Sequence, residues 1–241
     1  KGKAPGGYNM SMTEIGVTFI FMNAAGTESD VRTLIHEAGH AVHTFLSHPL
    51  EHTGLKNYPS EVAELASMSM ELMTMDYWDE FYPEEEDLRR AKKTQIEGVI
   101  KTLPWVATID SFQHWLYLNP QHTAEERCGQ WKKLYKRFAG EGISWEGLDR
   151  YEAYMWQKQL HIYEVPFYYI EYAMAQLGAV AMWRQYKENP AKAISNYITA
   201  LEAGYTRSIS EIYELAGIQF RFDEAYVQEL MDFLLEEYDR I

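Results

Sequence analysis

The sequence predicts a mainly α-helical fold with one small β element. Most apolar residues recur at helical spacing, in segments bounded by residues that begin or end helices. Only one short run, at residues 17–22, is β-branched and aromatic like a strand. Apolar residues make up 46% of the 241 residues and charged residues 24%, which suffices for a sizeable core. No linker, repeat or low-complexity tract stands out, so we interpret residues 1–241 as a single domain.

The expected elements follow one another with short connections. Residues 1–16 are rich in glycine and are expected to form a loop before the strand at 17–22. Thr27 or Ser29 is expected to cap the first helix, which ends near residue 47, and Ser60 the second, which ends near residue 80. Further helices are expected at 84–103, 105–118, 123–139, 167–188, 191–203, 208–216 and 223–239.

Charge and composition argue against nucleic acid and membrane partners. The formal net charge is −14, and no Lys/Arg patch with interleaved aromatic residues offsets the repulsion of a polyanion. No apolar run approaches the roughly 20 residues of a membrane span. The single cysteine, Cys128, excludes an intrachain disulfide and favours a reducing compartment, so we expect a cytoplasmic location. Residues 1–7 lack the apolar stretch of a signal peptide, and without an initiator Met the chain is expected to be a fragment or processed product.

The first predicted helix separates an apolar stripe from a polar face. At about 100° per residue, the stripe falls within about 40° of one line and is expected to face a core. Its members are Val31, Leu34, Ile35, Ala38, Val42 and Phe45. His36, His40 and His43 lie together on the opposite side, and Glu37 flanks them.

The segment His36-Glu37-Ala38-Gly39-His40 has the HExxH spacing of a zinc site. Histidines four residues apart lie one helical turn apart, so both imidazoles can reach one Zn²⁺. Glu37 can then reach a water on the metal, whose pKa zinc lowers to about 7. It would take a proton as hydroxide attacks a carbonyl, and pass it to the leaving amine. The alternative is that these residues form a solvated polar face and match the HExxH pattern by chance. A third metal ligand elsewhere in the chain would argue against a chance match.

Glu64 is favoured over His43 as that third ligand. His43 is seven residues from His36, about 10.5 Å along the axis, whereas two ligands of one ion lie within about 4 Å of each other. His43 is therefore expected to support or line the site. A second helix antiparallel to the first would bring Glu64 beside His36 and His40, and Glu71, two turns later on the same face, could orient a ligand histidine.

These residues resemble the M3 family of zinc oligopeptidases, with oligoendopeptidase F as the closer branch and thimet oligopeptidase as a more distant relative. The resemblance lies in residues 36–43, in Val62-Ala63-Glu64-Leu65-Ala66-Ser67, and upstream in residues 3–8 and 19–23. It implies a zincin-like multi-helix catalytic domain that forms the C-terminal half of a longer architecture. It also implies that His36, His40 and Glu64 bind one Zn²⁺ per chain and that Glu37 is the general base.

The resemblance extends to substrate recognition. In the family, an exposed strand edge just upstream of the metal helix pairs with the substrate backbone, which agrees with the unpaired N–H and C=O groups that an open edge offers to an extended peptide. Such an edge recognises backbone rather than side chains, so selectivity should be broad.

Downstream, residues 161–172 resemble the family's segment whose His and Tyr side chains reach the carbonyl oxygen opposite the zinc. The resemblance implies His161 and Tyr172 as catalytic residues, with Tyr169 next. A phenol O–H stabilises a developing oxyanion, and losing one such donor can cost about 3 kcal/mol of barrier. The register stays open, because Tyr168 and Tyr172 are one turn apart while Tyr169 and Tyr172 match the spacing of the thimet-like branch. For Tyr163 and Tyr168, aromatic packing is the favoured interpretation.

The sequence therefore predicts a zinc metalloendopeptidase that hydrolyses internal bonds of short unfolded peptides by Glu-assisted attack of zinc-bound water. Two alternatives stay open: a zinc aminopeptidase, and a catalytically incomplete metal-binding fragment that needs an N-terminal half. The expected partners are short peptides, with an N-terminal half or a second copy of the chain as further partners. Co²⁺ or Mn²⁺ could occupy the same ligands in place of zinc.

Overall fold

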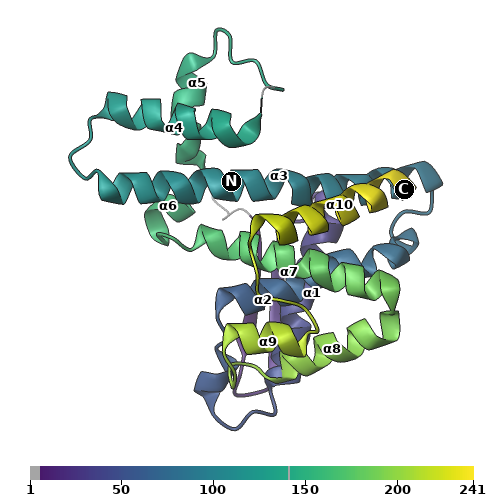
Figure 1. Ribbon diagram of the computed structural model, residues 1–241. Helices are drawn as coiled ribbons and strands as arrows, with labels where there is room; N and C mark the ends of the chain where they lie inside the picture. Colours follow the sequence, from purple (N-terminus) through teal and green to yellow (C-terminus); the bar gives the residue numbers. More distant parts are fainter. Residues whose placement is uncertain (1–5, 141) are drawn as a thin grey trace. The chain divides into compact units, whose positions relative to one another are not determined.

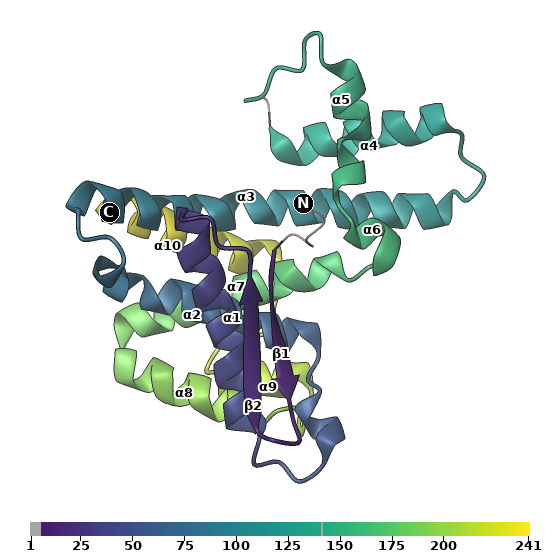
Figure 2. The same cartoon turned by 180° about the vertical axis from the view of Figure 1, so that it is seen from behind.

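A computed structural model describes residues 6–140 and 142–241, and its described part is mainly helical (Figures 1 and 2). The fold class predicted from the sequence is confirmed. Strands β1 (Gly7–Met12) and β2 (Val17–Met22) form an antiparallel hairpin in which Gly7 pairs with Met22 and Met12 with Val17. The α-helices are α1 (Glu28–Ser47), α2 (Ser60–Met73), α3 (Glu85–Leu118), α4 (Ala124–Ala139), α5 (Asp149–Tyr154), α6 (His161–Glu164), α7 (Tyr169–Glu188), α8 (Pro190–Glu202), α9 (Ile209–Leu215) and α10 (Glu224–Arg240). Short 3₁₀ helices span Thr53–Lys56, Thr74–Glu80 and Met155–Lys158.

Three sequence expectations for these elements are wrong. The loop expected at 1–16 contains strand β1, because pairing with β2 stabilises a glycine-containing segment that has little strand propensity of its own; residues 1–5 lie outside the described part. The helix expected from Ser60 to about residue 80 changes to 3₁₀ after Met73, where the Thr74 hydroxyl bonds to the Met70 carbonyl. The two helices expected at 84–103 and 105–118 are one, α3.

Helix α3 continues through Pro104, although an internal proline removes one backbone hydrogen bond and costs about 3 kcal/mol. Apolar side chains on both sides of the proline are almost fully buried, and their burial offsets that cost: Ile96, Val99, Val106 and Ile109. At this position, tertiary packing therefore outweighs the low helix propensity of proline.

The described chain forms two compact units. Unit 1 comprises residues 6–97 and 174–241, and unit 2 comprises residues 98–173. The interpretation of residues 1–241 as a single domain stays a prediction. None of the described helices combines the length and the apolar character that a membrane-spanning segment needs.

In unit 1, α1 packs against α2 and against the β-hairpin, which lies beside it in Figure 2. The core includes the fully buried side chains of Val62, Leu65, Leu72, Val180, Met182, Ile212, Leu230 and Leu234. Two tyrosines from later helices fix α2 through its backbone: the Tyr197 hydroxyl donates to the Ala66 carbonyl at 2.7 Å, and that of Tyr213 to the Glu61 carbonyl at 3.2 Å. Helix α2 is therefore held rigidly beside α1.

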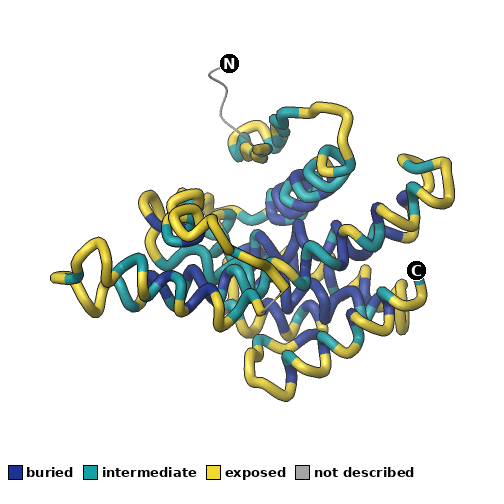
Figure 3. The backbone as a smooth tube through the Cα atoms, turned by 90° about the horizontal axis from the view of Figure 1, so that it is seen from above, coloured by how far each residue is buried: buried dark blue, intermediate teal, exposed yellow. Residues whose placement is uncertain are grey.

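Unit 2 has its own aromatic core. Its buried members are Ile109, Phe112, Trp131, Leu134, Tyr135, Trp156 and Ile162. The Trp131 indole donates to the Glu152 carbonyl at 2.8 Å, so the polar atom of this fully buried ring is satisfied. Figure 3 shows the resulting pattern along the helices, where buried stretches alternate with exposed ones and the connections are mostly exposed.

The orientation of α1 differs from the expected one. Ile35 of the predicted core-facing stripe is buried as expected, but Leu34 and Phe45 of the same stripe are 42% and 51% exposed. The polar face is buried instead: Glu37, His43 and Ser47 all lie below 9% exposure. The reason is that both α2 and the hairpin pack over that polar face, where His36, Thr44 and Ser47 have hydrogen-bond or ion-pair partners.

Gly39 sets the separation of α1 and α2. A Cβ atom at this position would lie 2.5 Å from the Ser67 Cα, a backbone atom that cannot rotate away. We therefore expect Gly39→Ala to push the helices apart and to lower the free energy of unfolding by about 1–3 kcal/mol. Urea unfolding of the metal-free protein measures this loss. Gly54→Ala is the matched control, because a Cβ there meets nothing within 4 Å; equal stability of the two variants would contradict the proposed packing.

Candidate active site

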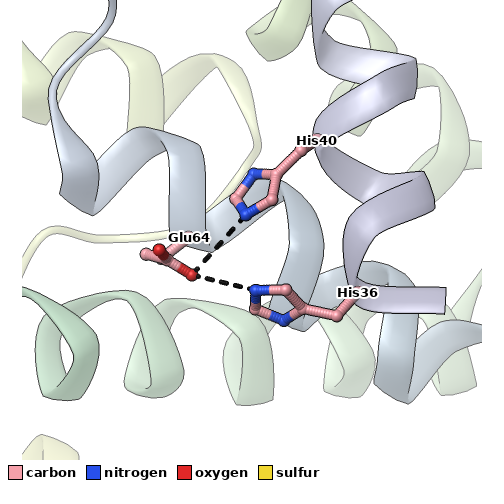
Figure 4. Close-up of side chains that lie close together, drawn as sticks. All are labelled: His36, His40 and Glu64. Atoms are coloured by element: carbon pink, nitrogen blue, oxygen red, sulfur yellow. Dashed lines mark ion pairs between the residues drawn. The ribbon is translucent and has the colours of Figure 1, made fainter. Parts of the chain in front are cut away.

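Two helices of unit 1 bring three potential ligand atoms together (Figure 4). His36 and His40 extend from one face of α1, and Glu64 extends from α2 between them. The Glu64 Oε2 atom lies 3.3 Å from His36 Nε2 and 3.9 Å from His40 Nε2, and all three ligand atoms lie within 4.8 Å of one another. Two ligands of one ion at about 2 Å each lie at most roughly 4 Å apart, so both Glu64 separations meet that limit.

The contacts run in opposite directions along the two helices. His36 contacts both Glu71 and Glu64, His40 contacts Glu64, and His43 stacks on Tyr58, which precedes α2. The expected antiparallel arrangement of the two helices is therefore confirmed. It explains why a glutamate from the early turns of α2 reaches both histidines.

A chain of hydrogen bonds supports His36 from behind. Its Nδ1 atom lies 2.6 Å from Glu71 Oε1, and the Gln95 side-chain amide donates to Glu71 Oε2 at 2.7 Å. Gln95 is 3% exposed and comes from the first part of α3. Glu71 thus accepts at both oxygens, which fixes the His36 ring with Nε2 toward Glu64. The contact between Glu71 and a candidate ligand histidine agrees with the sequence prediction.

The site favours a cation electrostatically. Burial alone would lower the pKa of His36, but the carboxylates of Glu64 and Glu71 raise it to about 10. The imidazolium form is therefore stabilised where the two carboxylates converge. For His40, burial dominates and lowers the pKa, so this ring favours the neutral form that can ligate a metal.

Glu37 is 6% exposed and lies against the hairpin. Its Oε1 atom would lie 3.4 Å from a Cβ placed on Gly7 of β1, and the Asn9 amide donates to the Glu37 carbonyl at 3.2 Å. Burial raises the pKa of the Glu37 carboxyl; nearby His36 opposes this, whereas the Glu64 carboxylate adds to it. A carboxylate with a raised pKa is a stronger base, which suits proton transfer near neutral pH.

His43 is absent from the group of converging ligand atoms, as helix geometry predicted. It is fully buried and stacks on Tyr58 with ring centroids 3.4 Å apart. It therefore supports the packing between α1 and the segment before α2, and it does not line an open cleft.

Unit 2 gathers the predicted His and Tyr side chains into one cluster. The Tyr172 hydroxyl lies 3.5 Å from His161 Nε2, and the His161 ring centroid lies 4.9 Å from that of Tyr169 and 6.0 Å from that of Tyr168. Tyr163 instead stacks on Trp156 of the unit 2 core. That His161, Tyr172 and Tyr169 face the metal ligands stays a prediction, as does the choice of register.

Neighbouring groups determine which His161 nitrogen carries the proton. The Trp105 indole can only donate, and it donates to Gln159 Oε1 at 2.9 Å. The other end of the Gln159 amide is therefore the NH₂ group, which lies 2.7 Å from His161 Nδ1. Nδ1 accepts this hydrogen bond, so the neutral ring carries its hydrogen on Nε2. His161 can thus donate from Nε2, which is the atom beside the Tyr172 hydroxyl.

Sequence reasoning missed Gln95, Gln159 and Trp105. Gln95 lies 24 positions from Glu71, and Trp105 lies 54 positions from Gln159. Isolated Gln and Trp residues carry no spacing signal, and only the packing of distant helices gives them their partners. Only a general rule could have indicated such residues: a ligand histidine needs a hydrogen-bond acceptor, and that acceptor in turn needs a donor.

Two histidines one turn apart, a glutamate from a second helix and a buried glutamate beside them are the residue types of a metallopeptidase centre. The sequence model of Peptidase family M3 matches residues 1–232. The chain therefore belongs to peptidase family M3.

Individual relatives agree with this assignment. The chain is 25% identical to oligopeptidase PepF of Bacillus subtilis over 228 residues, covering 93% of the chain and 33% of that protein. It is 26% identical to an oligoendopeptidase F homolog of Borreliella burgdorferi over 225 residues, covering 90% of the chain and 37% of that protein. The structure of PZ peptidase A with inhibitor 2 matches with a TM-score of 0.91 and 32% identity, over 100% of this chain and 42% of that one. The chain thus spans about a third of the length of these two curated relatives.

Proposed function

We propose that the chain is a zinc-dependent endopeptidase domain that acts on short, unfolded peptides. The convergence of His36, His40 and Glu64 beside the buried Glu37 carries this proposal. Membership of a peptidase family supports it, as do relatives described as oligopeptidase and oligoendopeptidase.

The ligand atoms fit zinc by their chemistry. Two imidazole nitrogens and one carboxylate oxygen form the three-ligand set of catalytic zinc sites, and His36 has the hydrogen-bonded acceptor that such ligands require. His36, His40 and Glu64 would hold one Zn²⁺, which supplies Lewis acidity and makes water a nucleophile near neutral pH.

Glu37 moves the protons. Its carboxylate accepts a proton from the attacking water and then gives it to the amine of the departing peptide fragment. Its burial beside β1 shields it from solvent, and the charges of His36 and Glu64 lie close enough to shift the pKa of its carboxyl. His161 Nε2 and the hydroxyls of Tyr172 and Tyr169 would donate to the carbonyl oxygen as negative charge develops on it.

The hairpin would recognise the peptide backbone. Among the described residues its sheet has two strands, so each strand has one edge without a strand partner. Gly7 places β1 next to Glu37, and an extended peptide on the open edge of β1 would pass the proposed base. Backbone pairing at this edge gives broad selectivity.

One experiment separates endopeptidase from aminopeptidase activity. A fluorogenic peptide is offered to the zinc-loaded chain with either a free or an acetylated N-terminus. We expect both forms to be cleaved at the same internal bond with similar kcat/KM. Cleavage of the free form alone would show an aminopeptidase and overturn the endopeptidase proposal.

A second candidate is a metal-binding piece that needs a further polypeptide for activity, and the short span of the chain relative to its relatives favours it. Zinc binding without hydrolysis by the chain alone, with activity restored by the remaining part of a relative, would support this candidate. Assembly with a second copy and a cytoplasmic location also stay predictions.

Gln95 is expected to tune zinc binding through Glu71 and His36. Gln95→Met keeps the volume but removes the donor to Glu71 Oε2, which loosens the His36 ring. Losing such an indirect support typically weakens metal binding by about 10- to 100-fold. Competition with a chelating dye measures the zinc Kd. Gln176→Met is the control, since this glutamine is also buried; an equal Kd for both variants would remove Gln95 from the site.

A further inference from the structure

A polar cavity of about 230 Å³ lies at the C-terminal end of α1 in unit 1. Three segments line it: the end of β1 with the turn that follows, the last turns of α1, and the connection that precedes α2. The side chains that matter here are Ser11, Thr13, Thr44, His48, Lys56 and Tyr58. They supply four hydroxyl groups, one imidazole and one ammonium group.

Among the described residues, no carboxylate lines this cavity. Within the described part of the chain, the Lys56 ammonium has no carboxylate within ion-pair distance. The cavity therefore carries the positive charge of Lys56 beside polar side chains that can form hydrogen bonds, which is the chemistry that binds an anion.

The cavity continues the proposed catalytic face of α1. With about 100° per residue, Thr44 and His48 lie about 40° and 80° from His40, on the same side as Glu37 at about 60°. The Thr44 hydroxyl donates to the His40 carbonyl at 3.1 Å and lies 2.7 Å from the Ser11 hydroxyl. Strand β1 runs beside both places, since Gly7 adjoins Glu37 and Ser11 adjoins Thr44.

The spacing matches a peptide that extends along β1. Thr44 and His48 lie about 6 and 12 Å beyond His40 along the helix axis, and an extended peptide rises about 3.3 Å per residue. A residue about two to four positions from the cleaved bond would therefore reach the cavity.

We infer that this cavity is a subsite for a carboxylate of the peptide, either its C-terminal carboxylate or an acidic side chain, with Lys56 as the charged partner. The inference rests on the proposed function, because it assumes that the peptide lies along β1 past Glu37. Such a subsite would add a preference for negatively charged peptides to a site that otherwise recognises the peptide backbone.

Binding to the zinc-loaded Glu37→Gln variant tests this inference without requiring turnover. Fluorescence anisotropy measures the affinity for two series of labelled peptides. The first series compares one neutral peptide as its C-terminal acid and as its C-terminal amide. The second series uses amidated peptides and compares Glu with Gln, placed two to four positions from the cleaved bond on either side. We expect one carboxylate series to bind about tenfold more tightly than its neutral match. The tighter series identifies the source of the carboxylate.

Adding Lys56→Met should abolish that preference, whereas Lys92→Met should retain it. Lys92 is the matched control because it is also half-buried, lies in unit 1 and is not among the residues that line the cavity. His48→Gln serves as a second variant and should reduce the preference. Equal binding of acidic and neutral peptides, or equal effects of Lys56→Met and Lys92→Met, would overturn the inference. Failure of the parent chain to cleave any peptide, with the preference intact, would instead count against the proposed function.

Discussion

Replacing Glu37 by Gln should preserve zinc binding and reduce kcat by about 100- to 10,000-fold, the usual contribution of a positioned acid–base group. Gln has nearly the same shape and keeps the packing against β1, but its amide cannot accept and return a proton. Glu37 is not among the three converging ligand atoms, so the metal centre should remain intact. Zinc content and steady-state cleavage of a blocked fluorogenic peptide are measured on the same sample.

Glu28→Gln is the control for this substitution, because it makes the same chemical change on α1 but two turns or more from the histidines. We expect that variant to cleave at the parent rate. Turnover by Glu37→Gln within a few fold of the parent would remove Glu37 as the base.

Replacing Glu64 by Gln should have the largest effect on the metal. The neutral amide removes the only anionic ligand of the three converging side chains and leaves His36 and His40 to hold the ion. Loss of a residue that supports a ligand indirectly already weakens metal binding by about 10- to 100-fold. Loss of a direct ligand should therefore weaken zinc binding by more than about a hundredfold. Zinc content after dialysis against a weak chelator measures the result, and cleavage should fall in proportion.

Glu61→Gln on the preceding turn of α2 is the matched control and should retain one zinc per chain. If Glu64→Gln also retains one zinc per chain under the same dialysis, the ligand assignment is wrong. Circular dichroism distinguishes loss of the metal from loss of the fold.

The local part of this site could be predicted from the sequence because helix geometry is regular. The spacing of His36 and His40 places both rings on one face, and the rise of 1.5 Å per residue excludes His43. Glu64 and Glu71 followed from one further assumption, that the next helix runs antiparallel, and the contacts of His36 bear this out.

The surroundings of the helix could not be predicted, because they depend on which elements pack against it. Leu34 and Phe45 fit a core-facing stripe by periodicity, yet α2 and the hairpin cover the opposite face and leave both side chains exposed. Periodicity identifies the two faces of a helix, but here the polar face, which carries the candidate ligands, is the one that is enclosed. The contact of Gln95 with Glu71 could not be predicted either, because it depends on how α3 packs.

Titration of zinc into the metal-free chain, with cleavage of an N-terminally blocked fluorogenic peptide followed at each step, tests the central claim most directly. We expect the initial rate to rise in proportion to added zinc and to reach a plateau at one equivalent per chain. A chain that binds no zinc with a defined stoichiometry, or that cleaves the peptide at the same rate without zinc, would contradict it.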